Sequence, residues 1–93
     1  MSRKVKVSSR YKKDLKRIAN NPKLVSELTD VIVTLSCDIP LDAKYCDHPL
    51  HNDWEGFRDC HIRPDIVLIY QKYGDVIKFL KLERVGSHSE LRL

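Results

Sequence analysis

Hydrophobic residues recur at two different spacings in the first third of this 93-residue chain. Residues 3–7 alternate valine with charged residues, which is the two-residue period of a short strand. Ser8 and Ser9 suit the N-cap of a helix, and the next apolar residues follow the helical spacing: Tyr11, Leu15, Ile18 and Ala19. Asn20, Asn21 and Pro22 end this helix. A second helical stripe then runs to about Ser36: Leu24, Leu28, Val31, Ile32 and Leu35.

The second half of the chain shows a different pattern. Residues 37–56 follow neither period and contain Pro40, Pro49 and Gly56, so we expect an irregular connection. Connections of this length are uncommon in small domains and tend to be functional. Three strand-like runs follow at 57–63, 66–73 and 76–85, joined by tight turns at 63–65 and 74–75. A polar tail, residues 87–93, comes after Gly86.

This order predicts one α+β domain over residues 1–93, with the elements β-α-α-β-β-β. Short turns force the last three strands to be antiparallel, and the expected architecture is a small antiparallel sheet with both N-terminal helices on one face. In the strand at 57–63, Cys60 and Ile62 would face the helices. Asp59 and His61 would then share the open face, where a site is expected.

Composition and charge narrow the class of protein. The 42% hydrophobic and 32% charged content is too apolar for a disordered chain, and no apolar run is long enough to span a bilayer. The N-terminus has no continuous apolar segment, which argues against a signal peptide and favours a cytoplasmic protein without membrane contact. The three cysteines (Cys37, Cys46 and Cys60) are an odd number, which fits reduced thiols better than a disulfide framework.

The net charge of +4 is unevenly placed. Residues 1–23 hold nine Lys and Arg against one acid, whereas residues 24–56 hold one Lys against seven acids. Such a basic arm predicts a surface that faces a polyanion, and it could equally be the solvated face of an ordinary helix. The candidate nucleic-acid contacts on the first helix are Lys12, Lys13, Lys16 and Arg17.

All four histidines lie in the second half of the chain: His48, His51, His61 and His88. A histidine gives or accepts a proton near neutrality, so two histidines and a carboxylate beside a basic surface are the groups needed to cleave RNA without a metal. Plain solvation is the simpler interpretation for His51. A metal site is the competing hypothesis, with possible ligands at Asp47, His48, His51, Asp59 and His61. Pro49 argues against the helix that would align His48 with His51.

Four runs of residues resemble the YafQ branch of the RelE/ParE toxin superfamily. They are YKKDL at 11–15, DHPL at 47–50, WEGFRDCHIRPDIVLIY at 54–70 and RVGSHSEL at 84–91. The order and spacing of these motifs match over nearly the whole chain. The family's fold, a small antiparallel sheet with two N-terminal helices, agrees with the pattern of hydrophobic residues.

The resemblance implies a ribosome-dependent endoribonuclease that cuts mRNA, inhibits translation and is silenced by a cognate antitoxin. The implied active-site residues are His48, Asp59, His61, Asp65 and His88. His88 would be the general acid and His48 or His61 the base, with Asp59 and Asp65 orienting and tuning them. Arg84 would contact the phosphate, with Arg58 as a weaker candidate, and Lys12, Lys13, Lys16 and Arg17 would contact ribosomal RNA. The products would carry 2′,3′-cyclic phosphate and 5′-OH ends, and no metal or cofactor is implied.

One departure and one alternative remain. Close relatives tend to end with an aromatic residue that could stack on a base, whereas Arg92 and Leu93 stand here, and an arginine can also stack on a base. The alternative function is that of a ParE-like toxin that inhibits DNA gyrase by binding. Such a toxin does not need several proton-transfer groups, so the histidines favour the nuclease.

Overall fold

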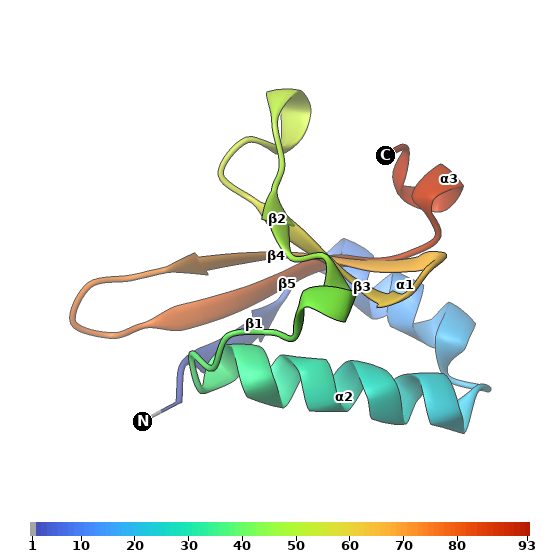
Figure 1. Ribbon diagram of the computed structural model, residues 1–93, viewed down its shortest axis with the longest axis horizontal. Coiled ribbons are helices and arrows are strands. Elements are labelled where there is room, and N and C mark those ends of the chain that lie inside the picture. The colour runs from blue at the N-terminus through green and yellow to red at the C-terminus, as the bar shows by residue number, and fades with distance from the viewer. Residues whose placement is uncertain (1) are drawn as a thin grey trace.

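A computed structural model describes residues 2–93 as a twisted five-stranded sheet with helices packed against it (Figure 1). The elements in chain order are β1 Lys4–Val7, α1 Ser9–Ile18, α2 Pro22–Ser36, the 3₁₀ turn η1 Ala43–Tyr45, β2 His48–Pro49, the 3₁₀ turn η2 Asn52–Trp54, β3 Arg58–Arg63, β4 Ile66–Tyr73, β5 Phe79–Gly86 and α3 His88–Leu91. Among the described residues, none of the helices is both long and apolar enough to cross a membrane.

The two N-terminal helices begin at the capping residues that the sequence indicates. Ser8 is the N-cap of α1, and its hydroxyl accepts a hydrogen bond from the Tyr11 amide at 3.0 Å. Asn21 is the N-cap of α2, where its side chain accepts from the Leu24 amide at 3.2 Å, and Pro22 occupies the first turn. Both caps satisfy amides that the helix itself leaves without a partner.

The sheet is mixed, which corrects the expectation of a purely antiparallel one. The strand order is β1-β5-β4-β3-β2, and β3, β4 and β5 form the expected antiparallel meander. β1 pairs parallel to β5, with Val5 opposite Leu80. No tight turn joins β1 to its neighbour in the sheet, so nothing local in the sequence fixes their relative direction.

The main core lies between the helices and one face of the sheet. Cys60 and Ile62 of β3 are buried there against α1 and α2, as the alternation in this strand predicts. β5 holds a bulge, because Arg84 pairs with Ile69 while Leu82 pairs with the next residue, Tyr70. The extra residue lets both Leu82 and Val85 face the helices.

The opposite face of the sheet is partly covered, whereas the sequence predicted it to be open. A second cluster forms there from the buried Val67, Ile69 and Leu91, and three half-buried residues pack against it: Leu50, Trp54 and Phe57. The segment around β2 and η2 and the short helix α3 therefore form walls on this face, as Figure 1 shows.

Several predicted boundaries also move. The first strand begins at Lys4, β3 begins at Arg58, and the last strand runs from Phe79 to Gly86 instead of over 76–85. The expected irregular connection holds η1, β2 and η2, and the polar tail forms α3. β2 and α3 carry residues of the candidate site.

Candidate active site

Three imidazole rings from distant parts of the chain meet on the face of the sheet away from α1 and α2. His48 comes from β2, His61 from β3 and His88 from α3. The ring centroids of His61 and His88 are 5.1 Å apart, and those of His48 and His61 are 6.3 Å apart. Asp59 precedes His61 by two residues on the same strand face and pairs across the strands with His48.

His48 has both ring nitrogens close to an oxygen. Its Nδ1 lies 2.6 Å from the backbone carbonyl of Cys46, and its Nε2 lies 3.1 Å from Oδ1 of Asp59. A carbonyl oxygen only accepts, so Nδ1 must carry a proton. His48 is therefore held between the carbonyl of Cys46 and the carboxyl of Asp59.

Asp59 is one of the few buried charged residues, with 3% of its surface exposed. Burial raises the pKa of this carboxyl above its ordinary value, although the nearby His48, His61 and His88 pull it back toward the charged form. Its buried Oδ1 has no well-oriented hydrogen bond from the residues described. The 3.1 Å approach of His48 is thus an electrostatic contact.

His61 has fewer contacts to its ring nitrogens than His48 or His88. It is half-buried and lines a hollow together with Cys46 and Arg63. Within residues 2–93, no hydrogen bond ties either of its nitrogens, in contrast to His48. This leaves His61 able to take a proton from a bound molecule.

His88 is positioned by the capping of α3. Ser87 is the N-cap, and its side chain and that of Glu90 bond reciprocally to the backbone, which forms a capping box. The Nδ1 of His88 lies 3.9 Å from Oδ1 of Asp65, an exposed carboxylate in the β3–β4 turn. All five residues that the resemblance implies as catalytic therefore lie in or beside one cluster, with Asp65 at its exposed edge.

Each of the two predicted phosphate-binding arginines is paired with an aspartate that is not part of the histidine cluster. Arg84 donates from Nε and Nη2 to the two carboxylate oxygens of Asp14, at 2.9 and 2.8 Å. Burial alone would raise the pKa of Asp14, but the bonds from Arg84 and from the Val85 amide outweigh it and leave that pKa below its usual value. Arg58 pairs across the sheet with Tyr70, which faces the helices, and binds Asp47 at 3.2 Å. It therefore lies on the opposite face of β3 from Asp59 and His61.

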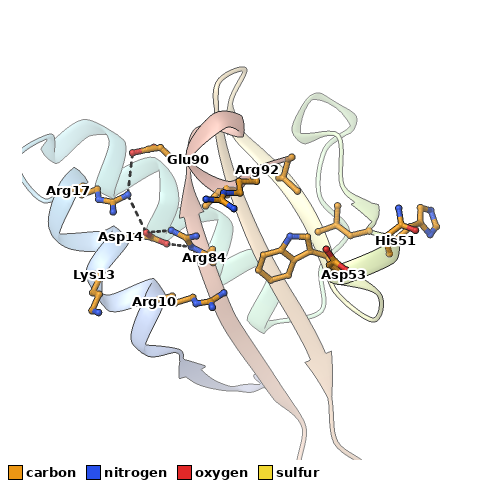
Figure 2. A pocket seen from close by; sticks show the side chains of 14 residues that line it. Arg10, Lys13, Asp14, Arg17, His51, Asp53, Arg84, Glu90 and Arg92 are labelled. Carbon is orange, nitrogen blue, oxygen red and sulfur yellow. Dashed lines mark hydrogen bonds and ion pairs between the residues drawn. The ribbon is translucent and has the colours of Figure 1, made fainter.

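The four predicted basic residues of α1 divide into two groups. Lys13 and Arg17 line a groove of about 880 Å³ between α1, α3 and the segment around η2, whereas Lys12 and Lys16 are exposed outside it (Figure 2). No local pattern in the sequence indicates the groove or its further residues, which include Arg10, Trp54 and Arg92. Arg10 precedes Lys13 by three residues and Arg17 by seven, a spacing that places all three on one helix face.

Of the five possible metal ligands, His48, Asp59 and His61 lie in the histidine cluster, and the other two are engaged elsewhere. Asp47 binds Arg58, and His51 lines the groove instead of the histidine cluster. Across residues 2–93, no group of three or more His, Cys, Asp and Glu side chains is arranged to hold a metal ion.

Comparison with known proteins identifies similarity over nearly the whole chain. Residues 3–93 match the family described as the bacterial toxin of type II toxin–antitoxin system, YafQ. The chain is 39% identical to the mRNA interferase toxin YafQ of Escherichia coli K12, over 98% of this chain and 97% of that protein.

Two solved structures show the same fold. One is a copper-bound mutant toxin from Helicobacter pylori, with a TM-score of 0.86, 41% identity and coverage of 98% and 99% of the two chains. The other is a DinJ-YafQ toxin-antitoxin complex from E. coli, with a TM-score of 0.82, 37% identity and coverage of 98% of each chain.

Proposed function

Because this chain belongs to the YafQ family of bacterial type II toxins, we propose that it is an endoribonuclease that cuts mRNA on the ribosome and so inhibits translation. Residues 1–93 would form a single toxin domain that acts in the cytoplasm. The observation that carries the proposal is the convergence of three imidazoles beside a basic groove. These groups suit the cleavage of a phosphodiester by proton transfer.

The proposed reaction is an attack of the ribose 2′-OH on the adjacent phosphorus. A base takes the 2′ proton, the new O–P bond forms, the bond to the 5′ oxygen breaks, and an acid protonates that oxygen. The products are a 2′,3′-cyclic phosphate and a 5′-OH, and no water is consumed. The negative charge that grows on the phosphate oxygens favours a site rich in cations.

We assign His61 as the base and His88 as the acid. Both nitrogens of His48 are occupied by Cys46 and Asp59, whereas His61 has open nitrogens and lies one ring away from His88. The carboxylate of Asp65 lies 3.9 Å from Nδ1 of His88, where it would orient the ring that donates the proton. The His48–Asp59 pair would orient the site and stabilise the proton that His61 takes up.

Arg84 keeps a role in binding phosphate, through the part of its guanidinium that Asp14 does not hold. Asp14 engages Nε and Nη2, which leaves Nη1 for a ligand. We do not assign Arg58 to the phosphate, because it lies across β3 from the histidines.

Primer extension on mRNA in translating ribosomes tests the function directly. We expect discrete cuts when the protein is added, and no cuts in the same mRNA without ribosomes. Cutting should persist in EDTA, since the proposed proton transfers use no metal; dependence on added copper or zinc would contradict this mechanism. Intact mRNA together with inhibited gyrase supercoiling would favour the ParE-like alternative.

The role of His88 can be tested with a substrate whose leaving group needs no proton. In a 5′-phosphorothiolate RNA, sulfur replaces the departing 5′ oxygen, and a thiolate leaves without acid catalysis. We expect His88→Ala to lose at least about 100-fold in rate on ordinary RNA and to recover most of it on the sulfur substrate. His61→Ala should stay slow on both substrates. Equal recovery by the two variants would refute the assignment.

A cognate antitoxin is the expected protein partner. The E. coli relative crystallised with DinJ supports this pairing, and an acidic partner would suit the basic face of α1. Ribosomal RNA would be the second partner, with Lys12 and Lys16 as exposed contacts.

A further inference from the structure

The groove shown in Figure 2 lies beside the histidine cluster, and the proposed phosphate contact Arg84 is one of the residues that line it. Its walls are α1 on one side and the segment from Leu50 to Trp54 on the other, with α3 and the C-terminal residues at one end. With a volume of about 880 Å³, it is the larger of the two hollows beside the histidine-bearing elements.

Ion pairs inside the groove leave it positively charged. Arg84 neutralises the buried Asp14, and Arg17 contacts Asp14 at 3.7 Å and Glu90 at 3.4 Å. Arg10, Lys13 and Arg92 also line the groove, and none of them has an ion-pair partner within residues 2–93. Their charges remain available to an anionic ligand.

The groove also contains a flat aromatic surface. Trp54 is half-buried and belongs to the cluster that covers the sheet. The ring of Phe57 meets it edge-on, with centroids 5.6 Å apart, which fixes the indole in place. An immobilised tryptophan among cations is the arrangement that binds single-stranded nucleic acid, because every base has a face that can stack.

The position of α3 connects the groove with the histidines. His88, the first residue of this helix, contacts His61, while Glu90, Leu91 and the following Arg92 line the groove. The groove and the histidine cluster are therefore separated by about one turn of α3.

We propose that the groove binds the single-stranded RNA next to the cut phosphodiester, with Trp54 stacked on a base and Arg10, Lys13 and Arg92 contacting phosphates. The proposal rests on the proposed function and names where the substrate lies. An acidic protein segment would satisfy the cations but would leave Trp54 without a planar partner, so the aromatic surface favours RNA.

Trp54 reports on its own environment, because it is the only tryptophan in the chain. The probe is a short 2′-O-methyl oligoribonucleotide, which lacks the attacking hydroxyl and cannot be cut. We expect it to quench the tryptophan fluorescence of the wild-type protein. An oligonucleotide of equal charge with abasic sugars should bind at least about fivefold more weakly and quench little.

Substitution of the cations tests the phosphate contacts. The double change Arg10→Gln with Lys13→Gln should weaken binding at least about tenfold at low salt. It should also reduce the slope of log affinity against log salt by about 1.4, which is about 0.7 for each lost contact with a single strand. Lys23→Gln removes a charge from α2, outside the groove, and should leave this slope unchanged.

Three outcomes would overturn the proposal. They are unquenched fluorescence at saturating oligonucleotide, equal affinity for the abasic strand, and full displacement of the RNA by polyglutamate accompanied by the same quenching. If the wild-type protein still cuts mRNA on ribosomes in any of these cases, the proposed function stands and only the proposed binding site is rejected. If the protein binds the oligonucleotide with quenched tryptophan fluorescence but cuts no mRNA, the binding site stands and the proposed function is rejected.

Discussion

Two buried aspartates differ in their hydrogen bonds and in the direction in which folding shifts the pKa of their carboxyls. Asp14 and Asp59 are 2% and 3% exposed, respectively. Asp14 accepts two bonds from Arg84 and one from a backbone amide, and its pKa lies below the ordinary value. Asp59 has an oxygen without a hydrogen bond, and its burial raises its pKa. The first arrangement stabilises the fold, and the second is a source of strain at the candidate site.

Asp59→Asn should therefore make the protein more stable and less active. When folding raises the pKa of a carboxyl, the protein loses stability as the pH rises from the pKa of that carboxyl in the unfolded state through its pKa in the folded state. An amide does not ionise, so the variant should gain about 1 kcal/mol at neutral pH and show no advantage near pH 3. Urea unfolding at the two pH values measures this difference, and ribosomal mRNA cleavage measures the loss of activity. A variant less stable than the wild type at pH 7 would show that the contact with His48 outweighs the burial.

Asp14→Asn should make the protein less stable at neutral pH, in contrast to Asp59→Asn. The pKa of Asp14 is lowered by folding, so its contribution is present above the unfolded pKa and disappears as pH falls through the folded one. Removing the charge leaves Arg84 half-buried without its partner, which should destabilise the protein by about 3 kcal/mol at neutral pH. The difference from the wild type should shrink in acid. Asp30→Asn, on the exposed face of α2, is the matched control and should change little.

Some residues of the site could be placed from the sequence alone, and others could not. The alternation in β3 was enough to place Asp59 and His61 on one face, and the structure confirms it. The pairing of Arg84 with Asp14 joins residues 70 positions apart, and no local pattern indicates it. The resemblance alone therefore described Arg84 as a phosphate contact without its buried partner.

At the scale of elements, the sequence predicted best what local rules determine. α1 and α2 follow from capping residues and apolar stripes, and the meander follows from tight turns. The parallel pairing of β1 depends on a strand more than 70 residues away, and β2 has only two residues, too few to show a period. Ser87 and Glu90 have the spacing of a capping box, but the polar composition of residues 87–93 predicts a tail, and the structure shows the helix α3 there.

The capping of α3 gives a prediction at this scale, because the helix has only four residues and carries His88 at its start. Ser87→Ala removes the hydroxyl that accepts from the Glu90 amide, a change of about 1 kcal/mol in the capping of a helix. We expect kcat for mRNA cleavage to fall about tenfold with little change in KM, since the proposed acid, His88, is displaced while most of the proposed RNA contacts remain. Ser26→Ala on the exposed surface of α2 should keep wild-type values. A change in KM alone would indicate that α3 serves binding and not proton transfer.

On the scale of the whole molecule, charge is separated along the chain and again in space. The basic first 23 residues form β1, α1 and the start of α2, while most acidic residues between 24 and 56 lie on α2 and the segments after it. Within α1, one face lines the groove and another points to solvent. α1 thus presents two basic surfaces: one lines the groove that we propose for substrate RNA, and the other is exposed outside it, where we propose contact with the ribosome.

These two surfaces should respond independently to substitution. Lys12→Gln with Lys16→Gln removes two exposed charges outside the groove, so ribosome binding should weaken and its salt dependence should become less steep. The same variant should bind the 2′-O-methyl oligonucleotide like the wild type, because neither residue lines the groove. Lys78→Gln, in the β4–β5 connection, controls for net charge alone. Sedimentation with ribosomes over a salt series measures the first effect and tryptophan quenching the second. Parallel losses in both assays would mean that α1 presents one continuous surface to RNA, and the division between substrate and ribosome contacts would then be wrong.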